Sequence, residues 1–428
     1  MKRRMWKCCG RIRSGKPSCC IFVPCRPTST LLISIEGRNG QVRSASRRQR
    51  ACDMEFKTDR RTLIRVVARS LGLAALSTGL RGRAGLSWWS EPEPAKRSVD
   101  RDDAHAVRTP TGIWTSAEEL AGLTVSGPLW RNVKSAADRR TKPPNLSDQN
   151  QKNNVRVLAK ALVYAGTGEE RYRDEVVAHC LHAIGTEGGR TLPLARELLA
   201  YVIAADLVVL PSDANRRFRE WLNAVRHQEI GGRTLISTHE DRPNNWGTHA
   251  GASRIAVALY LQDEQDLERA SRVFKGWLGD RDAYAEFRYK EVDRWQADPA
   301  RPVGINPRGA TKLGRNIDGV LPDDQRRSGD FRWPPPKENY VYGALQGAVA
   351  QAVLLHRAGY DVWNWEDQAL LRAVRWLVET ADFPPVGDDV WILPLVDHYY
   401  GTHYWDGEPT RPGKNVGWSC WTHGGRSI

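Results

Sequence analysis

Residues Leu192–Leu210 read LPLARELLAYVIAADLVVL, and this stretch decides the fold. It is apolar on most faces of a helix and ends before Pro211, so it predicts a central helix. A helix that is hydrophobic on nearly all sides belongs in the interior of a larger helical domain.

Amphipathic stretches surround this segment along the chain. Asn153–Ala165 places its apolar residues on one stripe, which Gly166-Thr167-Gly168 interrupts. Further helices are predicted over Arg171–Ile184, Asp213–His227, His249–Leu261, Asp266–Leu278, Tyr340–Ala358 and Glu366–Thr380. Short Gly and Pro turns favour antiparallel helix hairpins, and strand signals are few. We therefore predict an all-α fold, an incomplete (α/α) toroid or barrel built from helix hairpins.

Two long segments lack this helical period. Asp282–Asn339 is rich in Pro, Arg, Gly and Trp, and Phe383–Ile428 has a similar character. Long irregular segments inside a compact domain usually carry function. We therefore expect the substrate cleft to be built from these two segments.

The charge of the chain is concentrated near its N-terminus. The 428 residues carry a formal net charge of +14, and residues 1–100 contain 22 Lys and Arg against 7 Asp and Glu. Residues 101–428 contain 42 Lys and Arg against 43 Asp and Glu. Because this part carries almost no net charge, a nucleic-acid-binding domain is not indicated. Six of the eight cysteines precede residue 53, which disfavours a zinc module or a disulfide scaffold in the body. No uncharged apolar run approaches the roughly 18–20 residues of a membrane span, so we expect no membrane insertion.

Three parts of the chain are predicted. Residues 1–53 form a disordered basic, Cys-rich extension, and residues 54–100 contain a signal and a linker. Within the latter, Asp59–Arg65 carries paired arginines ahead of the apolar Ser70–Leu76, as in a twin-arginine export signal. The alternative is an arginine-rich disordered tail. Residues 101–428 form the toroid catalytic domain, which we expect to be exported to the periplasm or the outside.

The first candidate for chemistry is R-P-N-N-W-G-T-H at residues 242–249. Pro243 fits the first turn of a helix, which would put Asn245 and His249 on one face. An amide can stabilise a developing enediolate while an imidazole takes the proton beside a carboxylate. The alternative is a helix N-cap asparagine with a core histidine.

The second candidate begins with D-G-V-L-P at residues 318–322, followed by Arg326, Arg327, Tyr340 and Tyr342. Arginine pairs bidentately with carboxylates, and a nearby arginine favours tyrosinate. A tyrosine beside an arginine can therefore act as base or acid on a sugar. The alternative is that the arginines pair with the adjacent aspartates and the tyrosines simply pack.

Together these stretches resemble the alginate lyase-type polysaccharide lyase family, the helical toroid uronate lyases. In that family an Asn-Asn-His segment opens a helix. It is followed along the chain by D-G-x-L-P, then by an arginine, and then by a tyrosine just before a helix that contains Ala-Leu. Asn244 and Asn245 match the amide pair, while Arg327 and Tyr340 match the arginine and the tyrosine. Trp246 stands where the family has its histidine.

The resemblance implies β-elimination on a uronic-acid-containing polysaccharide, alginate- or glucuronan-like, with no metal or organic cofactor. Asn245 and Arg327 would neutralise the C6 carboxylate, and Tyr340 would protonate the departing O4 to leave a 4,5-unsaturated end. Because the family histidine is missing, the base is left open between His249, His239 and Tyr340.

Other residues are expected to contact the anionic polysaccharide. Flat apolar sugar faces suit aromatic rings, and 14 Trp residues follow residue 100, although many must be core. The candidates for substrate binding are Asn244, Trp246, His239, Arg196, Tyr201, Arg326, Trp333 and Tyr342. Core packing is the alternative for Tyr201.

Two other functions remain open from the sequence. A glycoside hydrolase on the same helical layout would need two carboxylates flanking the scissile bond. Loop carboxylates are available at Asp318, Asp323, Asp324, Glu338 and Asp388. A non-catalytic carbohydrate-binding protein would keep the Trp-rich loops without bringing Asn245, Arg327 and Tyr340 together.

Overall fold

The computed structural model describes residues 112–425. The extension, signal and linker predicted for residues 1–53 and 54–100 therefore lie outside the described residues. In chain order the elements are α1 (Ala117–Ala121), α2 (Gly127–Ala137), α3 (Asn153–Thr167), α4 (Glu170–Ala183), α5 (Thr191–Val208), α6 (Ser212–Val225), α7 (Leu235–Asp241), α8 (Asn245–Leu261), α9 (Glu264–Leu278), β1 (Thr311–Lys312), β2 (Arg315–Asn316), α10 (Pro322–Gln325), η1 (Arg326–Ser328), α11 (Tyr340–Arg357), η2 (Val362–Asn364), α12 (Trp365–Arg375), η3 (Trp376–Thr380), η4 (Gly387–Ile392), α13 (Leu393–Tyr400) and α14 (Ser419–Thr422).

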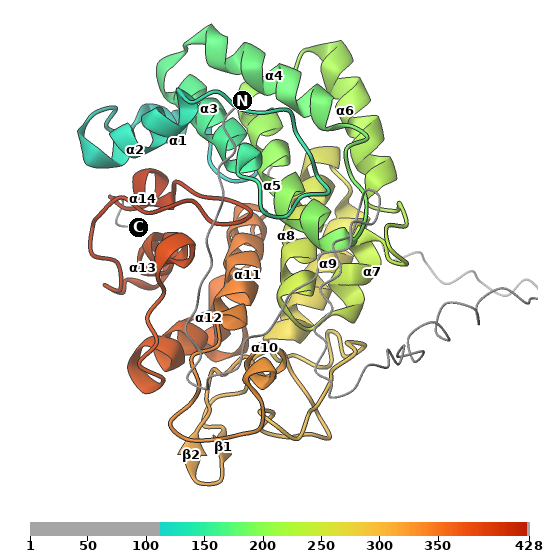
Figure 1. Ribbon diagram of the computed structural model, residues 1–428, viewed down its shortest axis with the longest axis vertical. Helices are drawn as coiled ribbons and strands as arrows, with labels where there is room; N and C mark the ends of the chain where they lie inside the picture. Colours follow the sequence, from blue (N-terminus) through green and yellow to red (C-terminus); the bar gives the residue numbers. More distant parts are fainter. Residues whose placement is uncertain (1–111, 426–428) are drawn as a thin grey trace, which may run out of the picture. The chain divides into compact units, whose positions relative to one another are not determined.

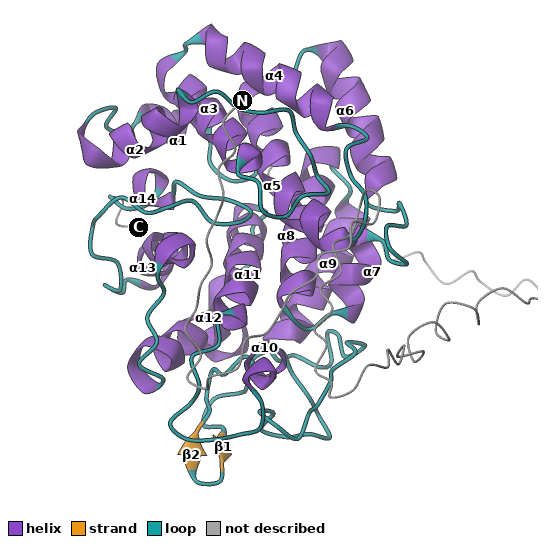
Figure 2. Ribbon diagram, viewed as in Figure 1, coloured by secondary structure: helices purple, strands orange, loops and turns teal. Residues whose placement is uncertain are grey.

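Helices make up the body of this fold, and its strands are confined to one short antiparallel hairpin, β1–β2, among residues 112–425 (Figures 1 and 2). The all-α prediction is confirmed. The longest helices form a row in which α3 packs on α5, α5 on α8 and α8 on α11, with α4, α7 and α9 packed along it. These pairwise contacts do not test the toroid, which stays a prediction.

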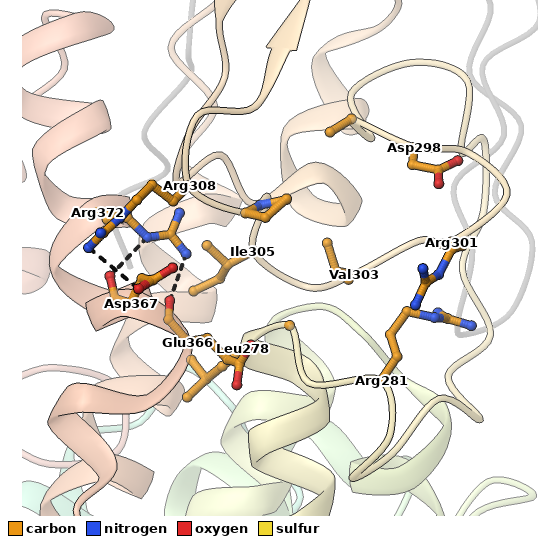
Figure 3. Close-up of a pocket in the computed structure, with 13 residues that line it drawn as sticks. Leu278, Arg281, Asp298, Arg301, Val303, Ile305, Arg308, Glu366, Asp367 and Arg372 are labelled. Carbon is orange, nitrogen blue, oxygen red and sulfur yellow. Dashed lines mark hydrogen bonds and ion pairs between the residues drawn. The ribbon is translucent and has the colours of Figure 1, made fainter.

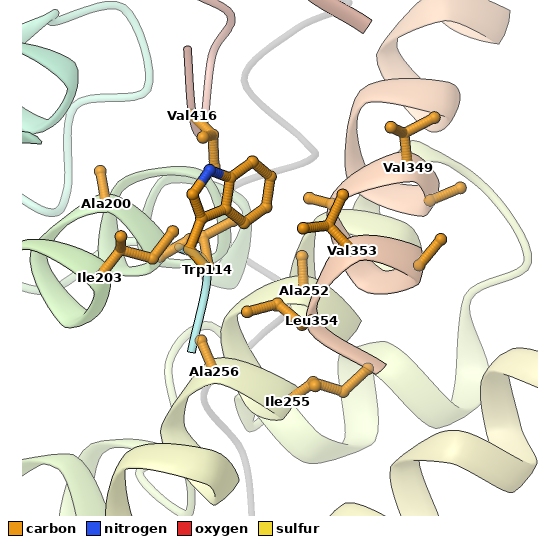
Figure 4. Close-up of a cluster of buried hydrophobic side chains, with 14 of the residues drawn as sticks. Trp114, Ala200, Ile203, Ala252, Ile255, Ala256, Val349, Val353, Leu354 and Val416 are labelled. Carbon is orange, nitrogen blue, oxygen red and sulfur yellow. The ribbon is translucent and has the colours of Figure 1, made fainter. Parts of the chain in front are cut away.

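The central helix predicted from Leu192–Leu210 is α5. Every residue of α5 except Asp206 is buried. Its Ala200 and Ile203 face a cluster to which α8, α11, Trp114 and Val416 contribute (Figure 4). The side chains drawn and labelled there are Trp114, Ala200, Ile203, Ala252, Ile255, Ala256, Val349, Val353, Leu354 and Val416. An apolar stretch with no polar face is thus enclosed by neighbouring helices, as its composition requires.

A glycine allows α8 and α11 to pack closely. A Cβ on Gly347 would lie 2.4 Å from the carbonyl carbon of Thr248, so only glycine fits there. Next to it, Gln351 donates from Nε2 to the Thr248 carbonyl at 3.0 Å. This contact holds α8, which begins at Asn245, against α11, which begins at Tyr340.

Several predicted boundaries were wrong. Pro243 lies before the helix and not in its first turn, because Asn244 is the N-cap of α8. The helix predicted from Glu366 fails at its start, where Glu366, Asp367 and Gln368 have φ of 48°, 57° and 58°. The segment Phe383–Ile428 was expected to be irregular, yet it contains η4, α13 and α14.

Within residues 112–425, no helix combines the length and the apolar character needed to cross a membrane. The same part of the chain contains no group of three or more His, Cys, Asp or Glu residues able to hold a metal ion.

Candidate active site

The start of α8 is anchored to α10 by its asparagine pair. Asn244 caps the helix, because its side chain accepts a hydrogen bond from the Trp246 backbone N–H at 3.1 Å. Its Nδ2 donates to Asp323 Oδ2 at 3.0 Å. The next residue, Asn245, directs its backbone N–H toward Asp324 Oδ1 at 3.4 Å. The N-cap alternative is therefore correct for Asn244, and the two motifs meet through the aspartates.

The D-G-V-L-P stretch shapes the turn that leads into α10. Asp318 accepts a hydrogen bond from Arg372 Nη1 at 2.5 Å. Gly319 has φ of 87°, and a Cβ there would lie 2.3 Å from the Arg372 carbonyl oxygen, so glycine is required. Pro322 then opens α10. The motif thus has a structural reason: it sets the direction of the short helix that precedes Arg327.

Arg327 and Tyr340 form the exposed part of the site. The guanidinium carbon of Arg327 lies 4.0 Å from the centre of the Tyr340 ring, within cation–π distance. Arg327 Nε lies 3.7 Å from Asp324 Oδ1, the oxygen that also faces the Asn245 N–H. Tyr340 is the first residue of α11 and is 47% exposed. Asp324 therefore links the Asn245 backbone to Arg327, and the Arg327 guanidinium lies in turn against the Tyr340 ring.

The carboxyl of Asp324, which links these residues, lies in an unusual environment. Its carboxyl is buried, and Oδ2 has no hydrogen-bond partner among the described residues. Burial and the neighbouring Asp323 raise the pKa of Asp324 well above 3.8, while Arg327 and the Asn245 N–H oppose this shift. A buried carboxyl of this kind holds its neighbours in fixed positions without itself reaching solvent.

The two histidine candidates lie inside the protein. His249 is 0% exposed, and neither ring nitrogen has a hydrogen-bond partner among the described residues. Burial, with the nearby Arg196 and Lys414, lowers the pKa of His249 well below 6.5. His239, on α7, is also buried, and burial lowers its pKa in the same way. Both imidazoles are therefore neutral near pH 7, and Tyr340 is the most exposed of the three candidates for the base.

Arg196 approaches the site from α5. It is 7% exposed, and its Nε has no hydrogen-bond partner within the described part of the chain. Burial lowers the pKa of Arg196, and Glu197, Asp388 and Tyr340 oppose that shift electrostatically. Arg196 thus interacts electrostatically with Tyr340.

Two tyrosines proposed for substrate binding are enclosed by the core. Tyr201 is 0% exposed, and its hydroxyl has no partner among residues 112–425. Tyr342 is 1% exposed, and its hydroxyl donates to the Phe383 carbonyl. Burial raises the pKa of both hydroxyls. The structure therefore keeps both tyrosines away from Arg327 and the solvent, and the core-packing alternative fits their positions.

Three other candidates occupy the rim. Arg326 pairs with Asp323 at 2.9 Å and with Glu291 at 3.0 Å, so it follows the ion-pair alternative. The half-buried Trp246 ring has the guanidinium carbons of Arg242 and Arg190 at 4.9 and 5.7 Å from its centre. Half-buried Trp333 has Arg315 at 5.6 Å. The tryptophans thus already carry arginines on their rings.

The sequence reasoning missed a polar contribution from the C-terminal segment. The Lys414 carbonyl accepts a hydrogen bond from Asn154 Nδ2 at 3.0 Å, and Lys414 Nζ lies 3.4 Å from Asp388. Asn415 donates from Nδ2 to the Gln346 carbonyl at 3.3 Å. The P-G-K-N-V-G-W run at residues 412–418, with a lysine and an asparagine between glycines, was the available signal.

The helices and the candidate residues together indicate a class of protein, and the family model then indicates a family. Helices packed in a row, with an asparagine, an arginine and an exposed tyrosine gathered at one end, have the layout that the resemblance to uronate lyases implies. Residues 138–283 match the family model described as alginate lyase, so the resemblance is confirmed over this part of the chain. A match of this kind indicates a polysaccharide lyase domain.

The matched region includes Asn244, Asn245 and His249 and ends before Asp318, Arg327 and Tyr340. A search of curated proteins found no match. The second half of the site therefore depends on its own motif and on the geometry described above.

Proposed function

We propose that this protein cleaves an anionic, uronic-acid-containing polysaccharide, alginate- or glucuronan-like, by β-elimination. The observation that carries the proposal is the chain of contacts from the Asn245 N–H through Asp324 and Arg327 to the Tyr340 ring. The match to the alginate lyase family over residues 138–283 supports the same class of reaction.

Neutralisation of the sugar carboxylate is the first requirement. A C5 proton becomes acidic enough to remove only when the charge of the adjacent C6 carboxylate is countered. Arg327 has the planar guanidinium that suits a carboxylate, and its side chain reaches solvent, being 27% exposed. Asn245 is 1% exposed, so in this proposal its Nδ2 would donate to the carboxylate from inside the protein and complete the neutralisation.

Proton transfer is assigned to Tyr340. As tyrosinate, its oxygen takes the C5 proton, and the C–H electron pair becomes the C4–C5 double bond while the C4–O4 bond breaks. The same hydroxyl then gives its proton to O4, which leaves a 4,5-unsaturated end and restores tyrosinate. The exposure of Tyr340 supports this choice over the buried His249 and His239.

The loop carboxylates do not favour a hydrolase, because four of them are already engaged by other groups of the protein. Asp318 is engaged by Arg372, Asp323 by Arg326, and Asp388 lies 3.4 Å from Lys414. Glu338 accepts a hydrogen bond from the Tyr340 backbone N–H at 3.1 Å. A glycosidase instead needs one free acid and one free base or nucleophile facing the bond.

The test is an incubation of the protein with alginate, glucuronan and a neutral glucan. Absorbance in the ultraviolet band of unsaturated uronides and the release of reducing ends are followed together. A lyase raises both signals with an acidic polymer and neither with the glucan. Reducing ends without absorbance would show a hydrolase, and retention of the polymer without either signal would show a binding protein. Export by the twin-arginine route is part of the proposal and is tested by locating the protein in cell fractions.

A further inference from the structure

A cavity of about 250 Å³ lies apart from the residues assigned to elimination. It is enclosed by the end of α9, residues 297–308 and the start of α12 (Figure 3). Neither Asn245, Arg327 nor Tyr340 lines it. Its volume is close to the lower end of the range for small-molecule sites.

The floor of the cavity is apolar. Leu278 at the end of α9, Val303 and Ile305 line it and are 1%, 8% and 0% exposed. Side chains this deeply packed are fixed in position. They give the cavity an apolar lining, against which one face of a sugar ring can lie.

One end of the cavity carries two arginines without acidic partners. Arg281 donates from Nη1 to the Pro302 carbonyl at 2.6 Å, which sets it beside Arg301 (Figure 3). Among the described residues, neither guanidinium forms an ion pair with a carboxylate. Asp298, which lines the same end, accepts a hydrogen bond from the Ala300 N–H at 2.9 Å. The Arg281 side chain thus keeps most of its N–H donors available to a ligand, and the Arg301 side chain keeps all of them.

At the opposite end of the cavity, both arginines have acidic partners. Arg372 pairs with Asp318, and it donates to the carbonyls of Glu366 and Asp367 at 3.0 and 3.1 Å. These bonds hold the left-handed turn that begins α12. Arg308 lies 3.6 Å from the Asp367 carboxylate. Of the four arginines that line the cavity, Arg281 and Arg301 are therefore the two without a carboxylate at ion-pair distance among residues 112–425, and the carboxylates of Asp298 and Glu366 also line it.

We propose that this cavity is a second carbohydrate site, which binds a single uronic acid residue with its carboxylate on Arg281 and Arg301. The inference rests on the proposed function for the choice of a uronate. The sugar ring lies on Leu278, Val303 and Ile305, and the arginine pair recognises the carboxylate bidentately. Such a site gives the enzyme a second place to bind the polymer, apart from the bond that is cleaved at Tyr340.

The test uses the methyl glycoside of glucuronic acid, which has no glycosidic bond at O4 and so cannot be eliminated. Its binding to the full-length protein is followed by ligand-observed NMR, with methyl glucoside and inorganic phosphate as comparison ligands. We expect Arg281→Ala/Arg301→Ala to weaken uronate binding at this site at least tenfold, leaving only the binding that Arg327→Ala removes. Arg217→Ala, an exposed arginine on α6, is the matched control and should leave both sites intact.

Arg301→Ala alone guards against misfolding, because the Arg301 side chain makes no hydrogen bond that the fold would lose. Thermal unfolding of each variant checks this. Equal uronate binding by wild type and both arginine variants would overturn the inference, as would phosphate binding without uronate binding. If incubation with acidic polymers produces no rise in ultraviolet absorbance, while uronate still binds through Arg281 and Arg301, only the proposed function would be contradicted.

Discussion

The guanidinium carbon of Arg327 lies 4.0 Å from the centre of the Tyr340 ring, although 12 residues, including a Trp-Pro-Pro-Pro run, separate the two in sequence. The η1 turn carries Arg327, and Tyr340 opens α11. Arg327 Nε lies 3.7 Å from Asp324 Oδ1, which faces the Asn245 N–H at the start of α8, so the exposed phenol carries on its ring a guanidinium that is tied to α8.

Tyr340→Phe should abolish elimination and leave the fold intact. The change removes only the hydroxyl of a side chain that is 47% exposed, so the loss of stability should be small. Loss of general acid–base catalysis typically costs about 10²–10⁴-fold in rate. Absorbance of unsaturated products measures the effect, and Tyr164→Phe on α3 is the matched control. Activity within tenfold of wild type would remove Tyr340 from the mechanism.

Arg327→Lys should weaken elimination although the charge is kept. A lysine loses the planar fork and the stacking on the Tyr340 ring. Hydrogen bonds to charged groups contribute about 1.5–3 kcal/mol, so kcat/KM should fall by about tenfold to a hundredfold. The same substitution at Arg326, which pairs with Asp323 and Glu291, should cost less. Equal losses at the two positions would argue against carboxylate recognition by Arg327.

His249→Asn should change stability and its pH dependence more than catalysis. The folded protein disfavours the protonated imidazole, since burial lowers the pKa of His249 well below 6.5. The unfolded chain therefore binds more protons below about pH 6.5, and the free energy of unfolding falls as the pH is lowered. We expect urea unfolding between pH 5 and 7 to show a shallower acid loss in the variant. Elimination that disappears in a folded variant would return His249 to the position of base.

Glu197→Gln should make the protein more stable at alkaline pH relative to wild type. Burial raises the pKa of Glu197 to about 9, and neither carboxyl oxygen has a partner among the described residues. The folded state therefore holds a proton that the unfolded chain has lost above about pH 4.5. Stability from this group is full below that pH and declines toward pH 9, by up to about 1.4 kcal/mol per pH unit. Urea unfolding at pH 5, 7 and 9 measures it, and parallel curves for the two proteins would contradict the assignment.

Gly319→Ala should lower both stability and activity. A left-handed conformation costs a non-glycine residue about 1–2 kcal/mol, and the new Cβ would also lie 2.3 Å from the Arg372 carbonyl oxygen. Gly309→Ala is the control, because Gly309 has φ of 73° with open space around it. The difference between the two midpoints of thermal unfolding isolates the steric contact. If both variants unfold at the same temperature, the turn before α10 is not as tightly packed as described.

The sequence alone determined the helical character of this protein and most of its helix positions. Apolar residues at helical spacing are a local signal, so α3, α5, α6, α9 and α11 fall within a few residues of their predicted limits. The same local chemistry gave the asparagine pair, the D-G-V-L-P turn and the Arg–Tyr pair, and the resemblance they carry is confirmed over residues 138–283. The prediction from helical spacing failed where tertiary contacts override it. At Glu366 the backbone forms a left-handed turn, and its carbonyl accepts a hydrogen bond from Arg372.

Only the tertiary structure decided which candidates are buried and which are exposed. Spacing places Asn245 and His249 on one helix, but the enclosure of His249 depends on other parts of the chain. Likewise, the meeting of Arg327, Tyr340 and Asn245 requires the contact between α8 and α11 that Gly347 permits. Burial and proximity are set by residues far apart in the chain, so a pattern can propose functional groups but cannot tell which of them reach solvent.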